Sequence, residues 1–243
     1  MCLGVGALGL FAVAKAAGQS LVVPRRDWKM LAVVAVLNIT GWHLLSALGI
    51  SLMPANRALI LAYTMPLWAA LMAAAFLGER LTVFRVAGLA LGMTGMAVLI
   101  GAELATVRAA PWGALSMIAA AVLWGAGTVA YKSHRWSTGT AALTGWQMAV
   151  SGVPVFIGFL LFGHAPESAA LNWQAWAGLI YSATIPMVFC HWAWFRLVEL
   201  LPAGVAAIST LMIPVIGVMS SAPVLARRWA GARRRRWGWS WRR

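Results

Sequence analysis

An internal repeat limits what this chain can fold into more than any other feature. Residues 52–77 recur 148 positions further on as residues 200–225, without a gap. Both prolines of the first copy meet prolines in the second, which is informative because the chain has 10 prolines, whereas alanine and leucine matches are common. The identical positions are Leu52, Pro54, Ala55, Ala58, Ile60, Pro66, Ala74 and Leu77. The chain is therefore predicted to consist of two related halves.

Composition places both halves in a lipid bilayer. Hydrophobic residues make up 62% of the chain and charged residues 10%, with a mean hydropathy of +0.82, which leaves too little polar surface for a soluble globule. Apolar stretches, each near the roughly 20 residues that a transmembrane helix needs, cover residues 1–22, 30–53, 55–77, 84–102, 112–131, 142–163, 173–195 and 203–222. We predict an all-α, polytopic membrane helical bundle with eight spans.

Basic residues indicate how the spans are oriented. The odd connections between spans carry eight of them, and the even connections carry two, Arg57 and Arg108. The eight are Arg25, Arg26, Lys29, Arg80, Arg85, Lys132, Arg135 and Arg196. Because cytoplasmic loops are rich in lysine and arginine, the odd connections are predicted to be cytoplasmic. The protein is thus expected to be a multi-pass protein of the inner (plasma) membrane.

Several motifs of the chain resemble those of one transporter family. The motifs are Tyr63-Thr64-Met65-Pro66-Leu67-Trp68-Ala69-Ala70-Leu71, Phe76-Leu77-Gly78-Glu79-Arg80-Leu81-Thr82, a span with Gly88, Gly92 and Gly95, Leu123-Trp124-Gly125 with Lys132, and Leu201-Pro202-Ala203 to Ile213-Pro214. Over about residues 1–225 the chain resembles EamA-like members of the drug/metabolite transporter superfamily. The resemblance implies two inverted five-helix repeats and export of small metabolites or drugs by alternating access, without ATP.

Measured against that ten-helix pattern, the chain has three parts. Residues 1–103 are predicted to be the first EamA-like repeat without its first helix, and residues 111–225 the second repeat without its last helix. Residues 226–243, rich in arginine and tryptophan, are interpreted as a tail foreign to the family, produced by a shifted reading frame. The alternatives are a tail that binds anionic lipid at the membrane surface, or a specific anionic partner. No nucleic-acid partner is predicted.

The sequence lacks the residues of the common catalytic chemistries. All five acidic residues, Asp27, Glu79, Glu103, Glu167 and Glu199, fall at or near the ends of spans. The chain has neither a phosphate-binding Gly-x-x-x-x-Gly-Lys-Ser/Thr loop nor a His-Glu-x-x-His motif. Its two cysteines, Cys2 and Cys190, form no disulfide framework. We predict no enzymatic activity, no cofactor and no metal site.

Polar residues inside the spans are the candidate binding groups. The substrate-binding candidates are Asn38, Trp42, Tyr63, Thr64, Gln147, Tyr181 and His191, and His43 and Ser209 also lie within spans. Asn38 and Trp42, four residues apart, are expected to share a helix face. Helix kinks are predicted at Pro66, Pro186 and Pro214. The alternative is that these polar groups only join helices, through hydrogen bonds worth about 0.6 kcal/mol each.

Three further expectations concern packing and function. Glu79 is predicted to cap the helix that follows it, and Gly88, Gly92 and Gly95 to allow a close helix contact, inside the bundle or in a possible homodimer. Trp124, Trp146 and Trp194 could line a cavity or anchor spans at the interface. The predicted partners are the lipid bilayer and a small-molecule substrate. The alternative function is a non-transporting membrane fragment, either a pseudogene product or an interaction subunit.

Overall fold

The structure, a computed structural model, describes residues 2–80, 82–102, 109–162, 173–213 and 216. The chain divides into two compact units, Met1–Ile208 and Ser209–Arg243. The second unit lies almost wholly outside the described residues. Pro214 and the tail of residues 226–243 therefore fall outside them, and the predictions made for both stay predictions.

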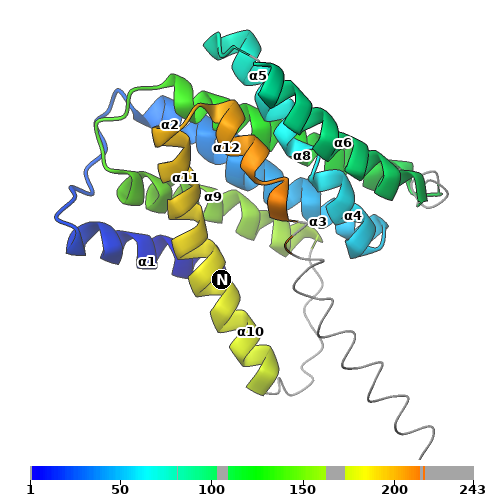
Figure 1. Ribbon diagram of the computed structural model, residues 1–243. Helices are drawn as coiled ribbons and strands as arrows, with labels where there is room; N and C mark the ends of the chain where they lie inside the picture. The colour runs from blue at the N-terminus through cyan, green and yellow to red at the C-terminus, as the bar shows by residue number, and fades with distance from the viewer. Residues whose placement is uncertain (1, 81, 103–108, 163–172, 214–215, 217–243) are drawn as a thin grey trace, which may run out of the picture. The chain divides into compact units, whose positions relative to one another are not determined.

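Helices form all the regular structure of the described residues, which confirms the all-α prediction. The first repeat contains α1 (Cys2–Ala16), α2 (Trp28–Val34), η1 (Ala35–Gly41), α3 (Trp42–Leu52), α4 (Ala55–Ala62), α5 (Met65–Leu77) and α6 (Val83–Ala102). The second contains α8 (Pro111–Ser133), α9 (Thr140–Phe162), α10 (Trp173–Thr184), η2 (Ile185–Cys190), α11 (His191–Leu200) and α12 (Ala203–Ser209). Figure 1 shows these helices in the order of the chain.

By length and composition, four helical stretches of the described chain are able to cross a membrane. They are Trp28–Leu52, Ala55–Leu77, Pro111–Ser133 and Thr140–Leu161. The first helix is shorter than the predicted stretch of residues 1–22 because it ends at Ala16. Gly18 follows at φ 68°, a left-handed conformation that glycine adopts without strain and that stops the helix.

The stretch predicted as one helix over residues 55–77 is two helices. Between α4 and α5, the amide of Thr64 bonds the carbonyl of Leu61 at 3.1 Å, a tighter turn than an α-helix makes. Pro66 follows at the start of α5, where its missing N–H costs little. The break therefore lies at Tyr63 and Thr64, just before the proline. At the other end, Gly78 closes α5 at φ 65°.

Two long helices each contain a π-helical segment. The segment η1 joins α2 to α3 and includes Asn38, and η2 joins α10 to α11 and includes Pro186. A shift of 148 carries residues 35–41 onto residues 183–189, which overlap η2. The two π-helices therefore occupy the same place in the two repeats. Such segments are rare, and they occur often at functional sites because they reposition backbone carbonyls.

Small residues set the packing between the long helices. The helix α1 packs along α9 (Figure 1), and α3 and α5 pack along α8. A Cβ atom on Gly125 of α8 would lie 2.9 Å from the amide nitrogen of Ala69 in α5, so only glycine fits there. Two glycines of α6, Gly88 and Gly95, make no close helix contact among the described residues, so a contact between subunits stays a prediction. Within the chain, a Cβ atom on Gly88 would touch only Ile208 at 3.9 Å, and one on Gly95 would meet nothing within 4 Å.

Large apolar side chains cover the outside of the helices. Phe84 of α6 is 91% exposed, Leu8 of α1 71% and Leu161 of α9 69%. A soluble protein seldom exposes so much apolar surface, whereas a bilayer solvates it. The polar residues inside the bundle therefore face protein or a cavity.

Candidate functional site

The structure buries two predicted substrate-binding residues, Asn38 and Gln147, in the interior of the bundle. Asn38 of η1 is 5% exposed and abuts Gly127 of α8, and Gln147 of α9 is 0% exposed. Ser151, one turn after Gln147, donates a hydrogen bond of 2.9 Å to the carbonyl of Ala35, so this face of α9 contacts η1. Neither amide has a hydrogen-bond partner among the described residues. Each is a buried group that lacks the partner such groups normally have.

The other candidates on the first repeat lie apart from these amides. Trp42 packs against a buried cluster that includes Leu61 and Met117. Asn38 lies in η1 and Trp42 opens α3 directly after it, and the expectation that they share a helix face stays a prediction. The hydroxyl of Thr64 donates to the carbonyl of Leu61 at 2.8 Å and accepts from Trp68 at 3.3 Å, so it is satisfied locally. Tyr63 lies beside it in the break between α4 and α5.

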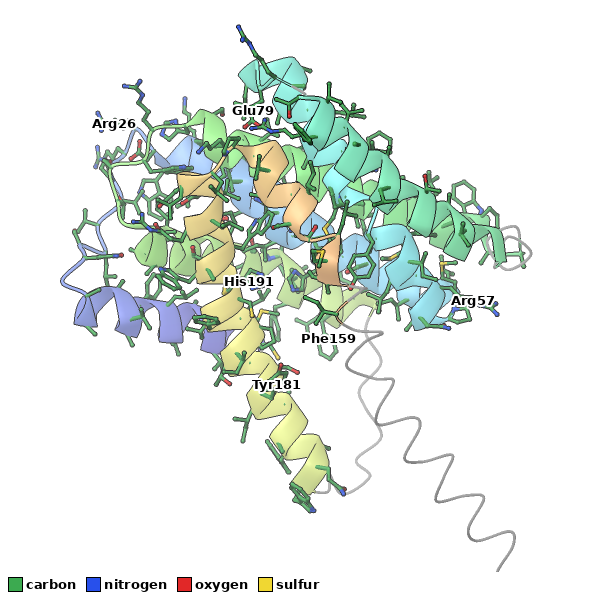
Figure 2. The ribbon with its side chains drawn as sticks, in the orientation of Figure 1. Arg26, Arg57, Glu79, Phe159, Tyr181 and His191 are labelled. Atoms are coloured by element: carbon green, nitrogen blue, oxygen red, sulfur yellow. The ribbon has the colours of Figure 1, made fainter. Side chains whose placement is uncertain are left out.

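The remaining candidates lie on the helix of the second repeat that contains η2. Figure 2 shows Tyr181 on α10 and His191 where α11 begins. Tyr181 is 60% exposed, so the structure places it on the surface of the described chain. His191 is half-buried, and its Nδ1 lies 2.8 Å from the carbonyl oxygen of Pro186. Pro186 is the second residue of η2, five positions before this histidine.

His43 belongs with His191, although it is absent from the predicted binding set. The two are 148 positions apart, the offset of the internal repeat. His43 is the second residue of α3, which follows η1, and His191 is the first residue of α11, which follows η2. The Nδ1 of His43 lies 2.7 Å from the carbonyl oxygen of Ile39. Comparing polar residues at the repeat offset would have identified this pair from the sequence.

The two π-helices meet in one hydrophobic cluster. Ile39 of η1 and Met187 of η2, again 148 positions apart, both pack against the cluster that contains Met148 of α9. Met148 is 0% exposed. The inner polar site is therefore built on η1 and α9, with the buried amides of Asn38 and Gln147 as its polar side chains.

The three tryptophans predicted to line a cavity or to anchor spans, Trp124, Trp146 and Trp194, pack against other side chains. Trp124 and Trp194 pack against each other with ring centroids 4.5 Å apart and ring planes tilted by 37°. The indole nitrogen of Trp194 is buried without a partner among the described residues. Trp146 lies 5.2 Å from Phe11 and from Trp28, and its indole N–H donates to the carbonyl of Leu21 at 2.8 Å. Trp194 thus leaves one indole N–H donor without a partner among the described residues, near the start of α11.

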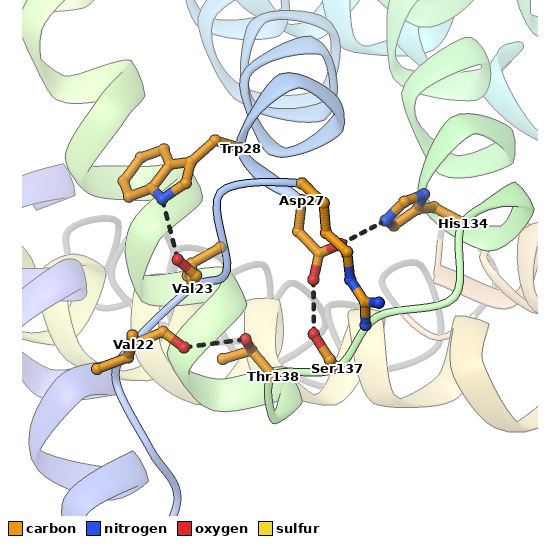
Figure 3. Close-up of polar contacts among 8 residues, drawn as sticks. Val22, Val23, Asp27, Trp28, His134, Ser137 and Thr138 are labelled. Carbon is orange, nitrogen blue, oxygen red and sulfur yellow. Dashed lines mark hydrogen bonds and ion pairs between the residues drawn. The ribbon is translucent and has the colours of Figure 1, made fainter.

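A second polar cluster, which sequence reasoning missed, joins two connecting segments (Figure 3). Asp27, with a side chain 1% exposed, accepts hydrogen bonds from Ser137 Oγ at 2.7 Å and from His134 Nε2 at 3.0 Å. The hydrogen bond from Ser137 contributes most, and that from His134 next, to lowering the pKa of Asp27 from its usual 3.8. Arg26 lies 3.6 Å away. No local sequence pattern links residues more than 100 positions apart.

A third cluster surrounds Glu199 at the end of α11. Its carboxylate accepts from the Tyr131 hydroxyl at 2.7 Å, from Thr140 at 2.6 Å and from Arg196 at 2.9 Å. Two cavities, of about 180 Å³ and about 500 Å³, are lined in part by Glu199. Neither cavity is lined by Asn38, Gln147 or His191. These cavities lie among the connecting segments and are separate from the inner polar site.

Glu79 caps a distant helix, which corrects the prediction that it caps the next one. Its carboxylate accepts the backbone N–H of Ala203 at 2.6 Å and of Gly204 at 3.1 Å, at the start of α12. Arg85 lies 3.7 Å from the same carboxylate. The left-handed Gly78 ends α5 directly before Glu79. This contact ties the end of the first repeat's Gly-Glu motif to the second repeat.

The donor set for a metal ion is absent from the described part of the chain. No group of three or more His, Cys, Asp or Glu side chains gathers there. The inner polar site instead offers two uncharged amides. Such uncharged hydrogen-bonding groups suit a small polar or amphipathic molecule.

Comparison with known proteins identifies the class to which this fold and site belong. The family model described as the EamA-like transporter family matches residues 1–101 and 111–230, and the chain belongs to that family. It is a family of membrane transporters and not of enzymes, and the chain is a membrane protein.

Relatives agree with this assignment. The chain is 23% identical over 215 residues to the "Uncharacterized transporter YoaV" of Bacillus subtilis (strain 168), covering 88% of this chain and 73% of that protein. It is 29% identical over 232 residues to the "Aromatic amino acid exporter YddG" of Ancylobacter novellus, covering 91% and 78%. It is 28% identical to the "Uncharacterized transporter YvbV" of Bacillus subtilis (strain 168), covering 82% and 64%. A crystal structure superposes with a TM-score of 0.76 at 22% identity, covering 92% of this chain and 76% of the other, which supports the fold alone.

Proposed function

We propose that this protein is a secondary transporter that exports small metabolites or drugs across the inner (plasma) membrane by alternating access. The observation that carries the proposal is the pair of buried, unpartnered amides, Asn38 and Gln147, beside two π-helices in equivalent places of the two repeats. Transporters of repeat architecture bind substrate between their repeats, where helices depart from regular geometry. Family membership supports transport in general.

Two buried amides without partners are hard to explain as structural elements. A buried amide that lacks a hydrogen bond costs about 1–3 kcal/mol relative to a satisfied one. In the structural alternative each amide would join two helices, yet neither meets a partner among the described residues. A bound substrate would supply the missing donors and acceptors.

The substrate proposed is a small molecule with an aromatic or otherwise flat apolar part. Trp194, which packs against Trp124, has a buried indole N–H without a partner among the described residues, as the amides do. Met148 and Ile39 contribute apolar surface beside them. A relative is named as an aromatic amino acid exporter, which favours aromatic amino acids as the first substrates to test.

The predicted orientation of the chain gives the contact between two connecting segments a role in alternating access. The odd connections, rich in basic residues, hold Asp27 and His134 together across the repeats, and the positive-inside rule places this side in the cytoplasm. In alternating access, contacts on one side close the path while the other side opens. We assign the Asp27–His134 contact to the cytoplasmic closure.

The test is uptake of labelled L-phenylalanine and L-tryptophan by proteoliposomes that contain the full chain. Gln147→Met removes the amide at nearly constant volume. Transport should fall at least about tenfold, the equivalent of one lost hydrogen bond to a polar substrate. Thermal stability should stay equal or rise, because no hydrogen bond within the protein is lost.

The matched control is Gln174→Met, the same change at an exposed position of α10. It should transport like the unmodified chain. Full transport by Gln147→Met would refute the role of the inner amides. Lack of transport by the unmodified chain, for these and for other amphipathic metabolites, would refute the proposed function.

A further inference from the structure

We propose that the cavity of about 500 Å³ beside Glu199 is an entry site, which binds the charged head of a zwitterionic α-amino acid before the substrate reaches the inner amides. Arg196 binds the carboxylate of the substrate there, and Glu199 binds its ammonium group. The inference rests on the proposed function and adds a second site and a substrate class to it. It is carried by the cavity, by the contacts of its two charged side chains and by its place among the connecting segments.

The cavity lies where three parts of the chain come together on one side of the bundle. It is lined by Gln19, which follows α1, by residues 136–140, which lead into α9, and by Trp192, Arg196 and Glu199 of α11. All three parts lie in or next to odd connections, which the basic residues place in the cytoplasm. A volume of this size suits a small molecule. The cavity is therefore on the side from which an exporter takes up its substrate.

Hydrogen bonds from two other helices hold the Glu199 carboxylate in place. It accepts from the hydroxyl of Tyr131 at 2.7 Å, near the end of α8, and from the hydroxyl of Thr140 at 2.6 Å, at the start of α9. The Nζ of Lys132 donates to the backbone carbonyl of Glu199 at 2.9 Å. Because Arg196 donates to the same carboxylate at 2.9 Å, the charged pair is positioned before a ligand arrives.

Arg196 keeps most of its hydrogen-bonding capacity for a ligand. A guanidinium carries several N–H groups in a planar fork, and the bond to Glu199 uses only Nη1. The Nε and Nη2 atoms pair with no described residue, and the side chain is 51% exposed. Two N–H groups on one edge of a guanidinium match the two oxygens of a carboxylate. Arg196 is therefore suited to the carboxylate of a substrate.

Glu199 keeps one acceptor position for the ammonium group. Its side chain is 24% exposed, and Oε1 accepts only the bond from Tyr131, whereas Oε2 accepts those from Thr140 and Arg196. A carboxylate oxygen can accept two hydrogen bonds, so Oε1 has one lone pair left. An α-amino acid places its carboxylate and its ammonium group on one carbon atom. Two side chains of opposite charge that touch each other are therefore complementary to such a head group.

Two tryptophans that line the cavity suit a flat apolar side chain. The indole N–H of Trp136 donates to the carbonyl of Tyr131 at 2.9 Å, and the two rings stack with centroids 5.4 Å apart. Trp192 is half-buried, and its indole N–H has no partner among the described residues. Aromatic rings held in place by packing offer stacking or edge contacts to a substrate ring. The cavity thus combines a site for the charged head with aromatic surface for the side chain.

One wall of the cavity is also part of the proposed cytoplasmic closure. Ser137, which lines the cavity, donates a hydrogen bond of 2.7 Å to Asp27 (Figure 3). Thr138, the next residue of that wall, donates to the carbonyl of Val22 at 3.3 Å. The segment that lines the cavity is therefore the one that ties the second repeat to the first. A molecule bound in the cavity lies directly against the contact that must open to admit it.

The experiment measures binding of three probes by calorimetry to the purified full chain, unmodified and with Gln147→Met, which removes an inner amide. The probes are L-phenylalanine, 2-phenylethylamine, which keeps the ammonium group alone, and 3-phenylpropionate, which keeps the carboxylate alone. L-Phenylalanine should bind at least about tenfold more tightly than either of the others, because each lacks one charged contact. Binding of L-phenylalanine should persist in Gln147→Met, since the entry site is separate from the inner amides.

Variants of Arg196, made in the Gln147→Met chain, test the carboxylate contact. Arg196→Gln should weaken binding of L-phenylalanine and of 3-phenylpropionate at least about tenfold and should not weaken that of 2-phenylethylamine. Arg196→Lys, which keeps the charge but not the fork, should show a smaller loss. The matched control is Arg135→Gln, at an exposed arginine outside the cavity, which should bind all three probes like the Gln147→Met chain.

Glu199→Gln in the same chain tests the ammonium contact. It should weaken L-phenylalanine and 2-phenylethylamine at least about tenfold and should spare 3-phenylpropionate. Loss of all three probes together with a lower Tm would show that Glu199 has only a structural role and would overturn its place in the site.

The outcomes separate this inference from the proposed function. Equal binding of L-phenylalanine by the Arg196→Gln and Arg135→Gln variants would overturn the entry site, even where the chain still transports phenylalanine. Loss of all binding in Gln147→Met would also overturn it, because the inner amides would then be the binding site alone. Tighter binding of either single-charge probe than of L-phenylalanine would overturn recognition of the zwitterion. Conversely, binding that depends on Arg196 without any uptake would leave the entry site standing and refute the proposed function.

Discussion

Glu79, at the end of α5, accepts a 2.6 Å hydrogen bond from the backbone N–H of Ala203, at the start of α12. The two residues lie 124 positions apart and belong to different repeats. A helix leaves its first N–H groups without partners and carries a partial positive charge there, so a carboxylate is well matched to it. Glu79 thereby serves as a clamp between the repeats.

Removal of this clamp should destabilise the protein. Glu79→Ala leaves the amides of Ala203 and Gly204 without an acceptor, at a cost of about 1–3 kcal/mol. The apparent Tm in detergent should fall by about 2–4 °C for each kcal/mol lost. Glu79→Gln, which keeps one acceptor oxygen, should show an intermediate loss. An unchanged Tm for Glu79→Ala would show that the clamp contributes nothing.

The Asp27 cluster should make stability depend on pH in the acidic range. Because the folded-state pKa of Asp27 lies below 3.8, the folded state binds the proton more weakly than the unfolded state. The resulting stabilisation is complete above pH 3.8 and is lost as the pH falls through the folded-state pKa. Asp27→Asn should therefore lower the Tm at neutral pH, and the gap should close in acid.

Ser137→Ala tests the cause of that pH dependence. The Ser137 hydroxyl contributes most to lowering the pKa of Asp27, so its removal should move the acid transition upward, toward pH 3.8. Thermal scans from neutral pH down to about pH 3 would follow both variants. A constant difference between Asp27→Asn and the unmodified chain at every pH would contradict this account.

Crowding at Gly125 should make it intolerant of a side chain. Gly125→Ala would place a methyl group 2.9 Å from the backbone of Ala69 and force α5 away from α8. Overpacking of this kind costs about 1–3 kcal/mol. Gly152→Ala is the matched control, because a Cβ atom there meets nothing within 4 Å. Similar Tm values for the two variants would show that α5 and α8 can move apart at little cost in stability.

Reporter fusions test the predicted orientation. Fusions after Arg26, Arg80 and Lys132 should report a cytoplasmic location, and fusions after Pro54 and Ala110 an external one. The expectation rests on the eight basic residues of the odd connections against two in the even ones. A cytoplasmic reading at Pro54 would contradict the charge-based orientation and, with it, the assignment of the Asp27 cluster to the cytoplasmic side.

Local sequence properties predicted the helices well where hydrophobicity changes sharply. The stretch predicted at residues 112–131 is the helix Pro111–Ser133, and the one at 142–163 is Thr140–Phe162. Two features were missed because they depend on backbone detail. Gly18 ends α1 earlier than hydropathy indicates, and the break before α5 lies at Tyr63 and Thr64, where no change in polarity marks it.

The candidate site was predicted in part. Asn38 and Gln147 are buried in the interior and His191 is half-buried, whereas Tyr181 is exposed. The hydroxyl of Thr64 is satisfied locally by the carbonyl of Leu61. Nothing local in the sequence distinguishes these cases, since each is a polar residue in an apolar stretch. Whether such a residue is buried or exposed depends on which helix faces pack together. A π-helical segment changes those faces because it rotates one part of a helix relative to the rest.

The sequence by itself determined that the chain is a membrane-embedded helical protein of two related halves, because hydropathy and the repeat offset are properties of the order of residues alone. Tertiary structure decided which residues of the two halves meet: Glu79 with Ala203, and Asp27 with His134. Those meetings depend on the close approach of helices at small residues such as Gly125 and on the phase of each helix after its π-segment. Both are results of packing between segments far apart in the chain, so no local pattern encodes them.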